Sequence, residues 1–257
     1  MVPLAILTRP DGRNEALADR LRGAGWEAHG WPALALEPVL AAADLPDPAG
    51  FDLVVFVSGN AARLFLERWR ARGGVDWPAA TAAATVGPAS AAALYESGAF
   101  GANTTVLHPG AEAPTHDSEA LWAILSQRPL PRRVLIVRGT RGREWLAERL
   151  RDVGAAVTPL AVYRRVPCLW DDARLAQIRD WAARDVRAHW LLTSAESIAA
   201  VRANIARADA GQWWSRGRAI ITHPALAEAL RVGGPGVAMV KECIPADEAI
   251  FAAFVAG

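Results

Sequence analysis

The sequence predicts an α/β protein built from two doubly wound parallel sheets. Short, continuously apolar segments such as Leu53–Val57 are typical of strands that helices cover on both faces, as in parallel sheets. These segments alternate with helical patterns along the chain, which is the order expected of βα units. In addition, the pattern of strand, small polar turn and helix in the first half recurs in the second half, about 130 to 136 residues later.

The clearest unit runs from Leu53 to Trp69. Its strand ends at Ser58-Gly59-Asn60, and a helix follows with Leu64, Phe65 and Leu66 on its apolar face. Small residues allow a tight turn and leave backbone N–H groups uncovered. In open α/β sheets a ligand usually lies just beyond the carboxyl ends of the strands. This turn is therefore a candidate binding segment.

Two turns of the second half repeat turns of the first half at the same spacing. Thr193-Ser194 follows an apolar strand that begins at His189, and Ser194 lies 136 residues after Ser58. Gly87-Pro88 ends the strand 82–86, and Pro224 of His223-Pro224 lies 136 residues after Pro88. Repetition at matched places is the mark of a duplicated unit.

The first strand–helix–strand unit also has a counterpart. Residues 4–8 predict a strand and residues 14–22 a helix, and a second strand over residues 26–36 is interrupted by Pro32. From residue 134 the same order returns, with an Arg138-Gly139 turn, a helix carrying Leu146 and Leu150, and a strand over residues 156–163. A strand and a helix close each copy: residues 104–108 and 117–125, then 237–241 and 247–254.

The chain thus contains two copies of a five-stranded pattern, and the first copy ends near Gln127. Each copy alternates strand and helix, so each is expected to build a parallel sheet. Halves of a duplicated chain can exchange strands. The period alone leaves open which strands share a sheet.

Composition excludes several classes of protein. The net charge of +1 offers no bulk field for nucleic acid or an anionic membrane. Neither of the two cysteines, Cys168 and Cys243, has a partner at metal-site spacing, and the five histidines are scattered, so no metal site is predicted. The start of the chain lacks a signal-peptide pattern and no apolar run reaches membrane-spanning length, which predicts a cytoplasmic protein.

The repeated turns predict a site for an anionic ligand. Two sheets that face each other would place many exposed N–H groups and helix N-termini around one cleft, where carboxylates or phosphates are favoured. Arginines after the first strand of each copy could add charge, namely Arg9, Arg138, Arg141 and Arg143. The ligand that fits is one with many acidic groups held mostly by backbone. A duplicated turn with a purely structural role would look the same.

The sequence lacks the motifs of dinucleotide-binding, phosphate-binding and hydrolytic sites. Gly139-Thr140-Arg141-Gly142 misses the third glycine of a dinucleotide-binding loop and is not a phosphate-binding Walker loop. No Ser-His-Asp set and no close pair of carboxylates can be placed. Glu112, His116 and Asp117 stand near a predicted helix start, where capping or solvation explains them. A cofactor-dependent or hydrolytic enzyme is disfavoured, and the eleven tryptophans have no functional explanation.

Taken in order, the motifs resemble the uroporphyrinogen-III synthase family over nearly the whole chain. The segments that carry the resemblance are Leu7–Pro10, Val57–Asn60, Thr85–Pro88, Ser118–Leu121, Val134–Gly139 and Ala161–Val166. Each of these segments is weak alone, but their order and spacing are specific to the family.

The resemblance implies two flavodoxin-like domains with swapped halves, joined by a hinge of two segments. Residues 1–35 and 169–257 would form the first, discontinuous domain, and residues 41–159 the second. The hinge would consist of residues 36–40 and 160–168.

The resemblance also implies an activity. The family converts linear hydroxymethylbilane to uroporphyrinogen III without a metal or organic cofactor, inverting ring D through a spiro intermediate. This is a lyase (hydro-lyase) reaction of tetrapyrrole biosynthesis, leading to heme, siroheme and cobalamin. The eight carboxylates of the substrate suit an anion-binding cleft. A monomer is expected, with functional coupling to hydroxymethylbilane synthase and without nucleic-acid or membrane partners.

Site residues follow from the same resemblance. Tyr163 matches the family's Val-Tyr position and is the candidate for assisting departure of the hydroxyl group. A hinge tyrosine with a purely packing role is the alternative. The expected substrate contacts, most of them through backbone N–H groups, are Arg9, Ser58, Gly59, Asn60, Gly87, Pro88, Ser90, Arg138, Gly139, Thr193, Ser194, His223 and Pro224.

Two departures from the family pattern keep an alternative open. The last turn of the family usually has Gly-Pro, where this chain has His223-Pro224, and Gly59 replaces the usual alanine. A Cβ atom at position 223 could narrow the cleft. The alternative is a catalytically weak two-domain binding protein for an anionic tetrapyrrole or another polycarboxylate. A transcriptional regulator is disfavoured, because no DNA-binding helix pair or basic patch is present.

Overall fold

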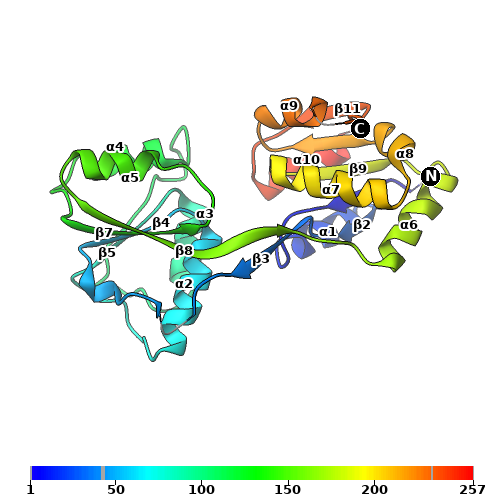
Figure 1. Ribbon diagram of the computed structural model, residues 1–257. Helices are drawn as coiled ribbons and strands as arrows, with labels where there is room; N and C mark the ends of the chain where they lie inside the picture. Colours follow the sequence, from blue (N-terminus) through cyan, green and yellow to red (C-terminus); the bar gives the residue numbers. More distant parts are fainter. Residues whose placement is uncertain (1, 42–43, 233, 257) are drawn as a thin grey trace. The chain divides into compact units, whose positions relative to one another are not determined.

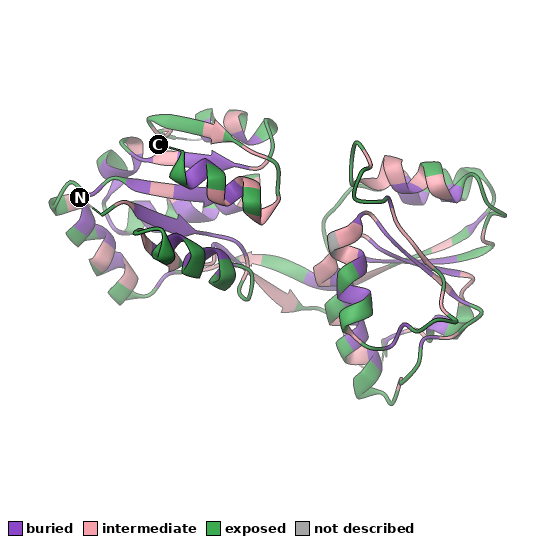
Figure 2. Cartoon of the chain, turned by 180° about the vertical axis from the view of Figure 1, so that it is seen from behind, coloured by how far each residue is buried: buried purple, intermediate pink, exposed green. Residues whose placement is uncertain are grey.

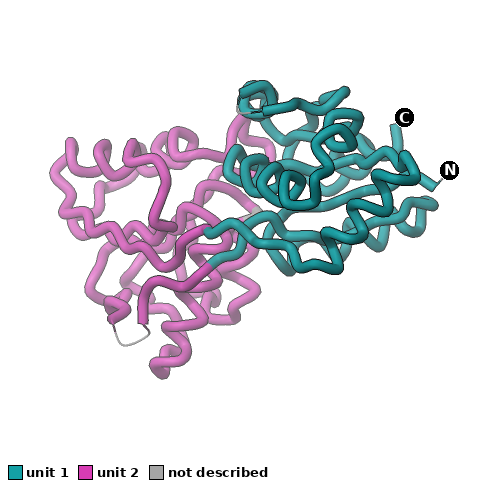
Figure 3. Tube along the Cα trace, turned by 45° about the vertical axis from the view of Figure 1, so that its right-hand side comes forward, with its two compact units in different colours: residues 1–36, 166–257 teal, residues 37–165 magenta. Residues whose placement is uncertain are grey.

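The chain divides into two compact units, each assembled around its own sheet. The computed structural model describes residues 2–41, 44–232 and 234–256. Unit 1 comprises residues 1–36 and 166–257, and unit 2 comprises residues 37–165 (Figure 3). The chain therefore starts in unit 1, builds unit 2 and returns to complete unit 1.

The sheet of unit 1 has five strands from both ends of the chain. They are β1 (Leu4–Leu7), β2 (Glu27–Gly30), β9 (Ala188–Leu192), β10 (Arg218–Ile221) and β11 (Met239–Glu242), in the order β11-β10-β9-β1-β2. All four neighbouring pairs are parallel. Within this unit, the order by position along the chain is 2-1-3-4-5, which is the flavodoxin-like arrangement.

Helices cover both faces of this sheet (Figure 1). Leu4 and Ile6 of β1 face α6 (Asp172–Ala183), α7 (Ala195–Arg207), α8 (Gly211–Ser215) and α9 (Ala225–Arg231). Ala5 and Leu7 face the other way, against α1 (Glu15–Gly23) and α10 (Asp247–Val255). Both faces of the inner strands β1, β9 and β10 are largely buried, whereas the edge strands β2 and β11 are more exposed (Figure 2).

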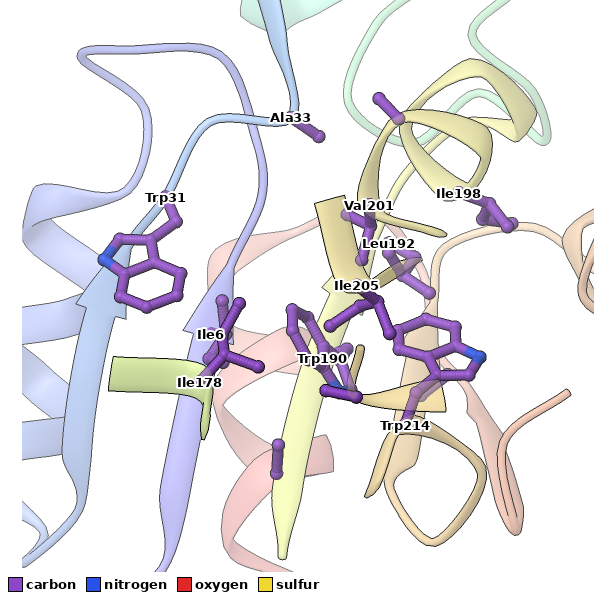
Figure 4. Close-up of a cluster of buried hydrophobic side chains, with 14 of the residues drawn as sticks. Ile6, Trp31, Ala33, Ile178, Trp190, Leu192, Ile198, Val201, Ile205 and Trp214 are labelled. Carbon is purple, nitrogen blue, oxygen red and sulfur yellow. The ribbon is translucent and has the colours of Figure 1, made fainter. Parts of the chain in front are cut away.

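The larger core of unit 1 is built around indole rings. Six tryptophans belong to it, and four of them have less than 2% of their surface exposed. Trp190 of β9 lies between helical side chains (Figure 4), stacked on Trp170 at 6.3 Å and tilted against Trp214 at 5.1 Å. Large aromatic rings bury more apolar area than aliphatic side chains do. More than half of the chain's eleven tryptophans therefore have a packing role in this core: Trp31, Trp170, Trp181, Trp190, Trp213 and Trp214.

The sheet of unit 2 has the same order of five strands, but the chain enters it at a different strand. Its strands are β3 (Leu34–Pro38), β4 (Leu53–Phe56), β5 (Ala82–Thr85), β6 (Val106–Leu107), β7 (Arg133–Gly139) and β8 (Ala156–Pro167). They lie in the order β3-β8-β7-β4-β5-β6. If β7 is counted first, the order of the five strands β8-β7-β4-β5-β6 is again 2-1-3-4-5. The strands β3 and β8 carry the chain from one unit into the other.

Helices also cover this second sheet on both faces. Leu53 and Val55 of β4 face α4 (Ser118–Leu125) and α5 (Trp145–Asp152). On the opposite face, the ring of Phe56 packs edge-on against Phe65 of α2 (Gly59–Ala71), at 5.5 Å between centroids. The helix α3 (Pro88–Glu96) lies against α2, and a short 3-10 helix, η2 (Pro48–Gly50), precedes β4.

The predicted α/β class with swapped halves is confirmed, because each sheet combines strands from both copies of the repeat. Two details differ from the sequence prediction. The apolar stretch 26–36 is not one strand: β2 belongs to the sheet of unit 1 and β3 to that of unit 2, with Pro32 between them. The helices α6 and α8 were not predicted. The bounds proposed for the domains and the hinge segments remain a prediction.

No helix in the described part of the chain is long and apolar enough to cross a membrane.

Candidate active site

The candidate site of unit 2 lies where the strand order of its sheet reverses. The strands β4 and β7 are parallel neighbours, with Phe56 opposite Val137. From β4 the chain continues toward β5, and from β7 it continues toward β8, on the other side. Ligands of doubly wound sheets bind at such a switch point, beyond the carboxyl ends of the strands. Ser58 follows β4 and Gly139 ends β7, so both lie at this point.

An irregular register at the end of β7 brings Tyr163 to the same place. Arg138 pairs with Ala161 of β8, but the next residue, Gly139, pairs with Tyr163, so the ladder skips Val162. A bulge of this kind redirects a side chain locally. The N–H of Thr140 donates to the carbonyl oxygen of Tyr163 at 2.9 Å, which fixes the backbone there. Only 3% of the surface of Tyr163 is exposed.

The tyrosine ring lies directly against Gly139. A Cβ atom added to Gly139 would stand 2.9 Å from both Cε2 and Cζ of Tyr163. Real Cβ atoms do not approach other carbon atoms so closely, so any side chain at position 139 would displace the ring. The glycine of the predicted Arg138-Gly139 turn is thus required by a close approach.

Ser58 lies next to the hydroxyl group of the tyrosine. Its Oγ atom accepts a hydrogen bond from the N–H of Ala61 at 3.1 Å and thereby caps α2. The same oxygen lies 3.3 Å from the hydroxyl oxygen of Tyr163. The serine is fixed by its capping role and in turn orients the phenol group.

Ser58, Arg138, Gly139 and Tyr163 line one cavity of about 290 Å³. Apolar side chains of β7, of α5 and of the turns after β4 and β5 form part of the remaining wall, and its polar part comes from the start of α4, from the loop between β7 and α5, and from β8. The polar residues are His116, Asp117, Ser118, Arg141, Arg143 and Arg165. The cavity therefore combines a buried phenol with several basic side chains.

The guanidinium group of Arg138 is largely used within the protein. It forms an ion pair with Glu144, donates from Nη2 to the carbonyl oxygen of Gly142 at 2.9 Å, and donates from Nε to that of Gly139 at 3.3 Å. Only 9% of the residue is exposed. Arg138 therefore orders the loop 139–144, and this role limits what its side chain offers to a ligand.

A second ion pair ties α4 to the same loop. Nη1 of Arg143 donates to Oε2 of Glu119 at 3.0 Å. The hydrogen bond from Arg143 holds the pKa of the Glu119 carboxyl below its ordinary value. Asp117 caps α4 by accepting from the N–H of Ala120 at 2.9 Å, as its position at the predicted helix start suggested. The cavity wall is therefore cross-linked between two elements.

The Gly87-Pro88 turn of unit 2 lies beside His116. A Cβ atom on Gly87 would stand 2.9 Å from the Cβ atom of His116, so the turn and the residue 116 segment pack closely. Nε2 of His116 lies 3.0 Å from the carbonyl oxygen of Gly110. Pro88 opens α3, and Ser90 lies in its first turn.

The predicted residues of unit 1 lie at the corresponding edge of its own sheet. Arg9 follows β1 and is buried, with Nη1 2.6 Å from Oδ1 of Asp247 in α10. Thr193 and Ser194 follow β9, and Ser194 forms a capping box with Ser197. His223 and Pro224 follow β10 and are exposed; Nδ1 of His223 accepts from the N–H of Ala225 at 3.1 Å.

The structure therefore sorts the predicted residues into groups. Four of them share the cavity with one another, as described above. Gly59, Asn60, Gly87, Pro88 and Ser90 occupy neighbouring turns of unit 2 but do not line that cavity. Sequence reasoning explained His116 and Asp117 by capping or solvation, and it named Ser118 only within a segment that resembles the family. The rule that ligands lie beyond strand ends could have found them, because they follow β6.

The described residues contain no group of three or more His, Cys, Asp or Glu side chains that could hold a metal ion. The chemical resources of the cavity are a phenol hydroxyl, basic side chains and backbone N–H groups at helix starts.

Comparison with known proteins identifies the family. Residues 15–249 match the uroporphyrinogen-III synthase HemD family. The chain is 31% identical to uroporphyrinogen-III synthase of Salmonella typhimurium over 201 residues, covering 75% of this chain and 76% of that protein. It is 28% identical to the Escherichia coli protein of the same name over 188 residues, covering 70% and 72%.

Solved structures agree on the fold. A uroporphyrinogen III synthase from Thermus thermophilus, a mutant form, superimposes with a TM-score of 0.56 at 20% identity, covering 99% of this chain and 97% of that one. Uroporphyrinogen-III synthetase from Helicobacter pylori gives a TM-score of 0.61 at 15% identity, covering 100% and 99%. Because the family match spans most of the chain, this protein belongs to the uroporphyrinogen-III synthase family.

Proposed function

We propose that the protein is an active uroporphyrinogen-III synthase, a hydro-lyase that cyclises hydroxymethylbilane to uroporphyrinogen III with inversion of ring D and without a cofactor. The observation that carries the proposal is the Tyr163 hydroxyl, buried at the switch-point cavity and held 3.3 Å from Ser58 Oγ. Membership of the family supplies the reaction to which this group is suited.

Tyr163 would act in the first step. The carbon–oxygen bond of the terminal hydroxymethyl group breaks, and the electron pair of the attached pyrrole forms the azafulvene. The departing hydroxyl group is a poor leaving group unless a proton or a hydrogen bond reaches its oxygen. A phenol within hydrogen-bonding distance can supply either, as a weak acid. The oxygen then leaves as water.

The later steps need control of shape more than further acid. The last pyrrole attacks the azafulvene carbon through its substituted carbon and forms the spiro intermediate. This intermediate fragments and closes again with ring D inverted, and loss of a proton restores the aromatic pyrrole. Uncatalysed closure gives the type I isomer instead. The protein must therefore hold the bilane in a curled conformer, which is catalysis by orientation.

Carboxylates of the bilane would be bound mainly by backbone donors. The N-termini of α2 and α3 lie at the carboxyl edge of the sheet in unit 2 and favour negative groups. The basic residues of the cavity would add charge. In this proposal the predicted contacts keep their roles, with Arg138 acting through the loop it orders: Arg9, Ser58, Gly59, Asn60, Gly87, Pro88, Ser90, Gly139, Thr193, Ser194, His223 and Pro224.

A coupled assay tests the function directly. Porphobilinogen and its deaminase supply fresh hydroxymethylbilane to the purified protein, the products are oxidised, and uroporphyrin isomers I and III are separated by chromatography. We expect isomer III to dominate in the presence of a metal chelator. A yield of isomer I equal to that of the deaminase alone would overturn the proposal.

The Tyr163→Phe variant tests the mechanism. Removing the phenol oxygen should lower kcat by about 100-fold, the lower range for loss of a general acid. Ring packing against Gly139 is retained, so the thermal midpoint should change little. If kcat is unchanged while the bilane binds normally, the acid role of Tyr163 is wrong.

His223 decides between the synthase and the binding-protein alternative. The His223→Gly variant restores the usual family residue and removes a ring that caps the start of α9. The binding-protein alternative would be favoured by two results together. The unchanged protein would bind polycarboxylate tetrapyrroles without synthase activity, and the His223→Gly variant would gain that activity. Monomeric state, cytoplasmic location and coupling to hydroxymethylbilane synthase belong to the same proposal, and light scattering with and without that enzyme tests the first and the last.

A further inference from the structure

A second cavity lies at the opposite edge of the sheet in unit 2. Leu53 begins β4, Ala82 begins β5, and Arg132 directly precedes β7. These strands are parallel, so their amino ends meet at one edge, away from Ser58 and Gly139. The cavity has a volume of about 450 Å³. Pockets for small molecules have volumes of roughly 300 to 1,000 Å³.

The walls of this cavity are mostly apolar. Leu53 and Leu125, the last residue of α4, are buried and have exposed fractions of 2% and 3%. Leu107 is half-buried, and Leu130 is exposed at the rim. Pro129 and Pro131 stiffen the connection between α4 and β7 on either side of Leu130. An alkyl chain or a small ring would lose its contact with water here.

The polar part of the wall is positively charged. Within the described residues, the side chains of Arg128 and Arg132 have no hydrogen-bond or ion-pair partner. Asp52 is the one carboxylate of the wall, and it is compensated. Its Oδ2 atom accepts the N–H groups of Arg132 and Arg133 at 2.9 and 2.8 Å, and Oδ1 lies 3.3 Å from Nη2 of Arg133. Two guanidinium groups thus remain for a ligand.

We propose that this cavity is a second binding site, specific for a small monocarboxylate with an apolar body, such as a medium-length alkyl chain. The apolar walls take the body, and Arg128 and Arg132 take the carboxylate. Arginine suits this ligand, because its planar fork matches the geometry of a carboxylate. The site uses none of the residues that line the switch-point cavity, so it stands independently of the proposed function.

Methyl NMR on the full-length protein, labelled at leucine methyl groups and titrated with sodium octanoate, tests the site. We expect saturable shifts at Leu53, Leu107, Leu125 and Leu130. Affinity should rise by up to about fourfold for each methylene from butanoate to octanoate, the gain for burying one such group. Octylamine should bind more weakly than octanoate, because the two arginines repel it. Shifts confined to Leu146 of the switch-point cavity, or none, would contradict the proposal.

Two variants locate the charge and the apolar pocket. The double change Arg128→Gln with Arg132→Gln should weaken octanoate binding by about five- to tenfold, as expected for the loss of two exposed charge contacts. The matched control, Arg149→Gln with Arg151→Gln on α5, removes two arginines outside the cavity and should leave affinity unchanged. Ala82→Phe should place a ring in the cavity, weaken octanoate binding and reduce the leucine shifts. Equal affinity in the first variant and its control, or undiminished binding to Ala82→Phe, would overturn the proposal.

Discussion

The two copies of the repeat place the same serine in two different environments. Ser58 and Ser194 both follow a central strand, both have extended backbone, and both accept a hydrogen bond from the third residue of the following helix. Ser194 is closed by a capping box, because Ser197 hydrogen-bonds back to the N–H of Ser194 at 3.2 Å. Ser58 lacks such a partner, since Ala61 has no hydroxyl, and its oxygen lies near Tyr163 instead.

The position of Tyr163 accounts for this difference between the two copies. The segment 26–36 of the first copy, which corresponds to the Tyr163 segment of the second, contains no tyrosine. Of these two matched segments, only the one in the second copy therefore places a tyrosine beside the turn after its central strand. The serine, the glycine and the tyrosine form a set in which each residue constrains the next. The predictions that follow test whether this set, and not the turn alone, carries the activity.

The largest effect is expected from Gly139→Ala. The added Cβ atom would meet the Tyr163 ring at 2.9 Å, so the ring must move by a sizeable fraction of an ångström. A displacement of about 1 Å at a reacting group costs about 100-fold in rate. We therefore expect a loss of kcat of that order in the coupled assay. Gly101→Ala is the matched control, because a Cβ atom there meets nothing within 4 Å.

If Gly139→Ala and Gly101→Ala keep the same kcat, the contact between Gly139 and Tyr163 has no catalytic importance. The folded fraction of both variants is measured by circular dichroism, so that a loss of fold is not mistaken for a loss of chemistry.

A smaller effect is expected from Ser58→Ala compared with Ser194→Ala. Both changes remove a helix cap and should lower the free energy of unfolding by about 1 kcal/mol. Only Ser58→Ala also removes the partner of the Tyr163 hydroxyl. One hydrogen bond corresponds to a loss of kcat of about three- to tenfold. Ser194→Ala should lower kcat by a smaller factor than this.

The measurement is kcat for both variants, together with urea unfolding. Asp171→Ala, which removes the cap of α6, reports the effect of destabilisation alone. Equal losses of kcat in Ser58→Ala and Ser194→Ala would show that the two copies contribute alike and that the tyrosine contact adds nothing.

Much of the fold could be predicted from the sequence, because burial on both faces leaves a local signal in each strand. Leu53–Phe56 is continuously apolar, and the small residues that follow mark the turn. The division of residues 26–36 between two sheets had a weaker signal. Pro32 indicates a break in a strand, but only pairing with residues far away, β1 for one part and β8 for the other, determines where each part goes.

The candidate site was less predictable, because it also depends on contacts between residues that are far apart in the sequence. Ser58 and Tyr163 are 105 residues apart, and their contact depends on a bulge that no local pattern announces. Arg138 shows what residue type alone leaves out. Its charge predicted a ligand contact, which stays a prediction, and the fold adds three partners within the protein: Glu144 and two carbonyl oxygens. Residue type and position could be predicted, but not the partner of each side chain.

The smallest effect concerns stability and a strand position where the two copies differ. His189 of β9 corresponds to Leu53 of β4 in the repeat. Its Nδ1 atom lies 3.3 Å from the carbonyl oxygen of Leu4, and its ring packs edge-on against Trp26 at 5.0 Å. Burial lowers the pKa of the His189 imidazole below its ordinary value. The imidazole of His189 therefore binds a proton less readily in the folded protein than in the unfolded chain.

The sign of the pH dependence follows from this difference. As the pH falls below about 6.5, the unfolded chain binds a proton at this position before the folded protein does, so the free energy of unfolding decreases, by at most about 1.4 kcal/mol per pH unit. His189→Leu, which places the residue of the other copy in β9, should make the decrease between pH 6.5 and pH 5 shallower. The other four histidines and all carboxylates are the same in both proteins, so the difference between their urea unfolding curves isolates His189. Parallel pH profiles would mean that His189 is protonated equally easily in the folded and unfolded states, and that its burial between Leu4 and Trp26 does not exclude the charge.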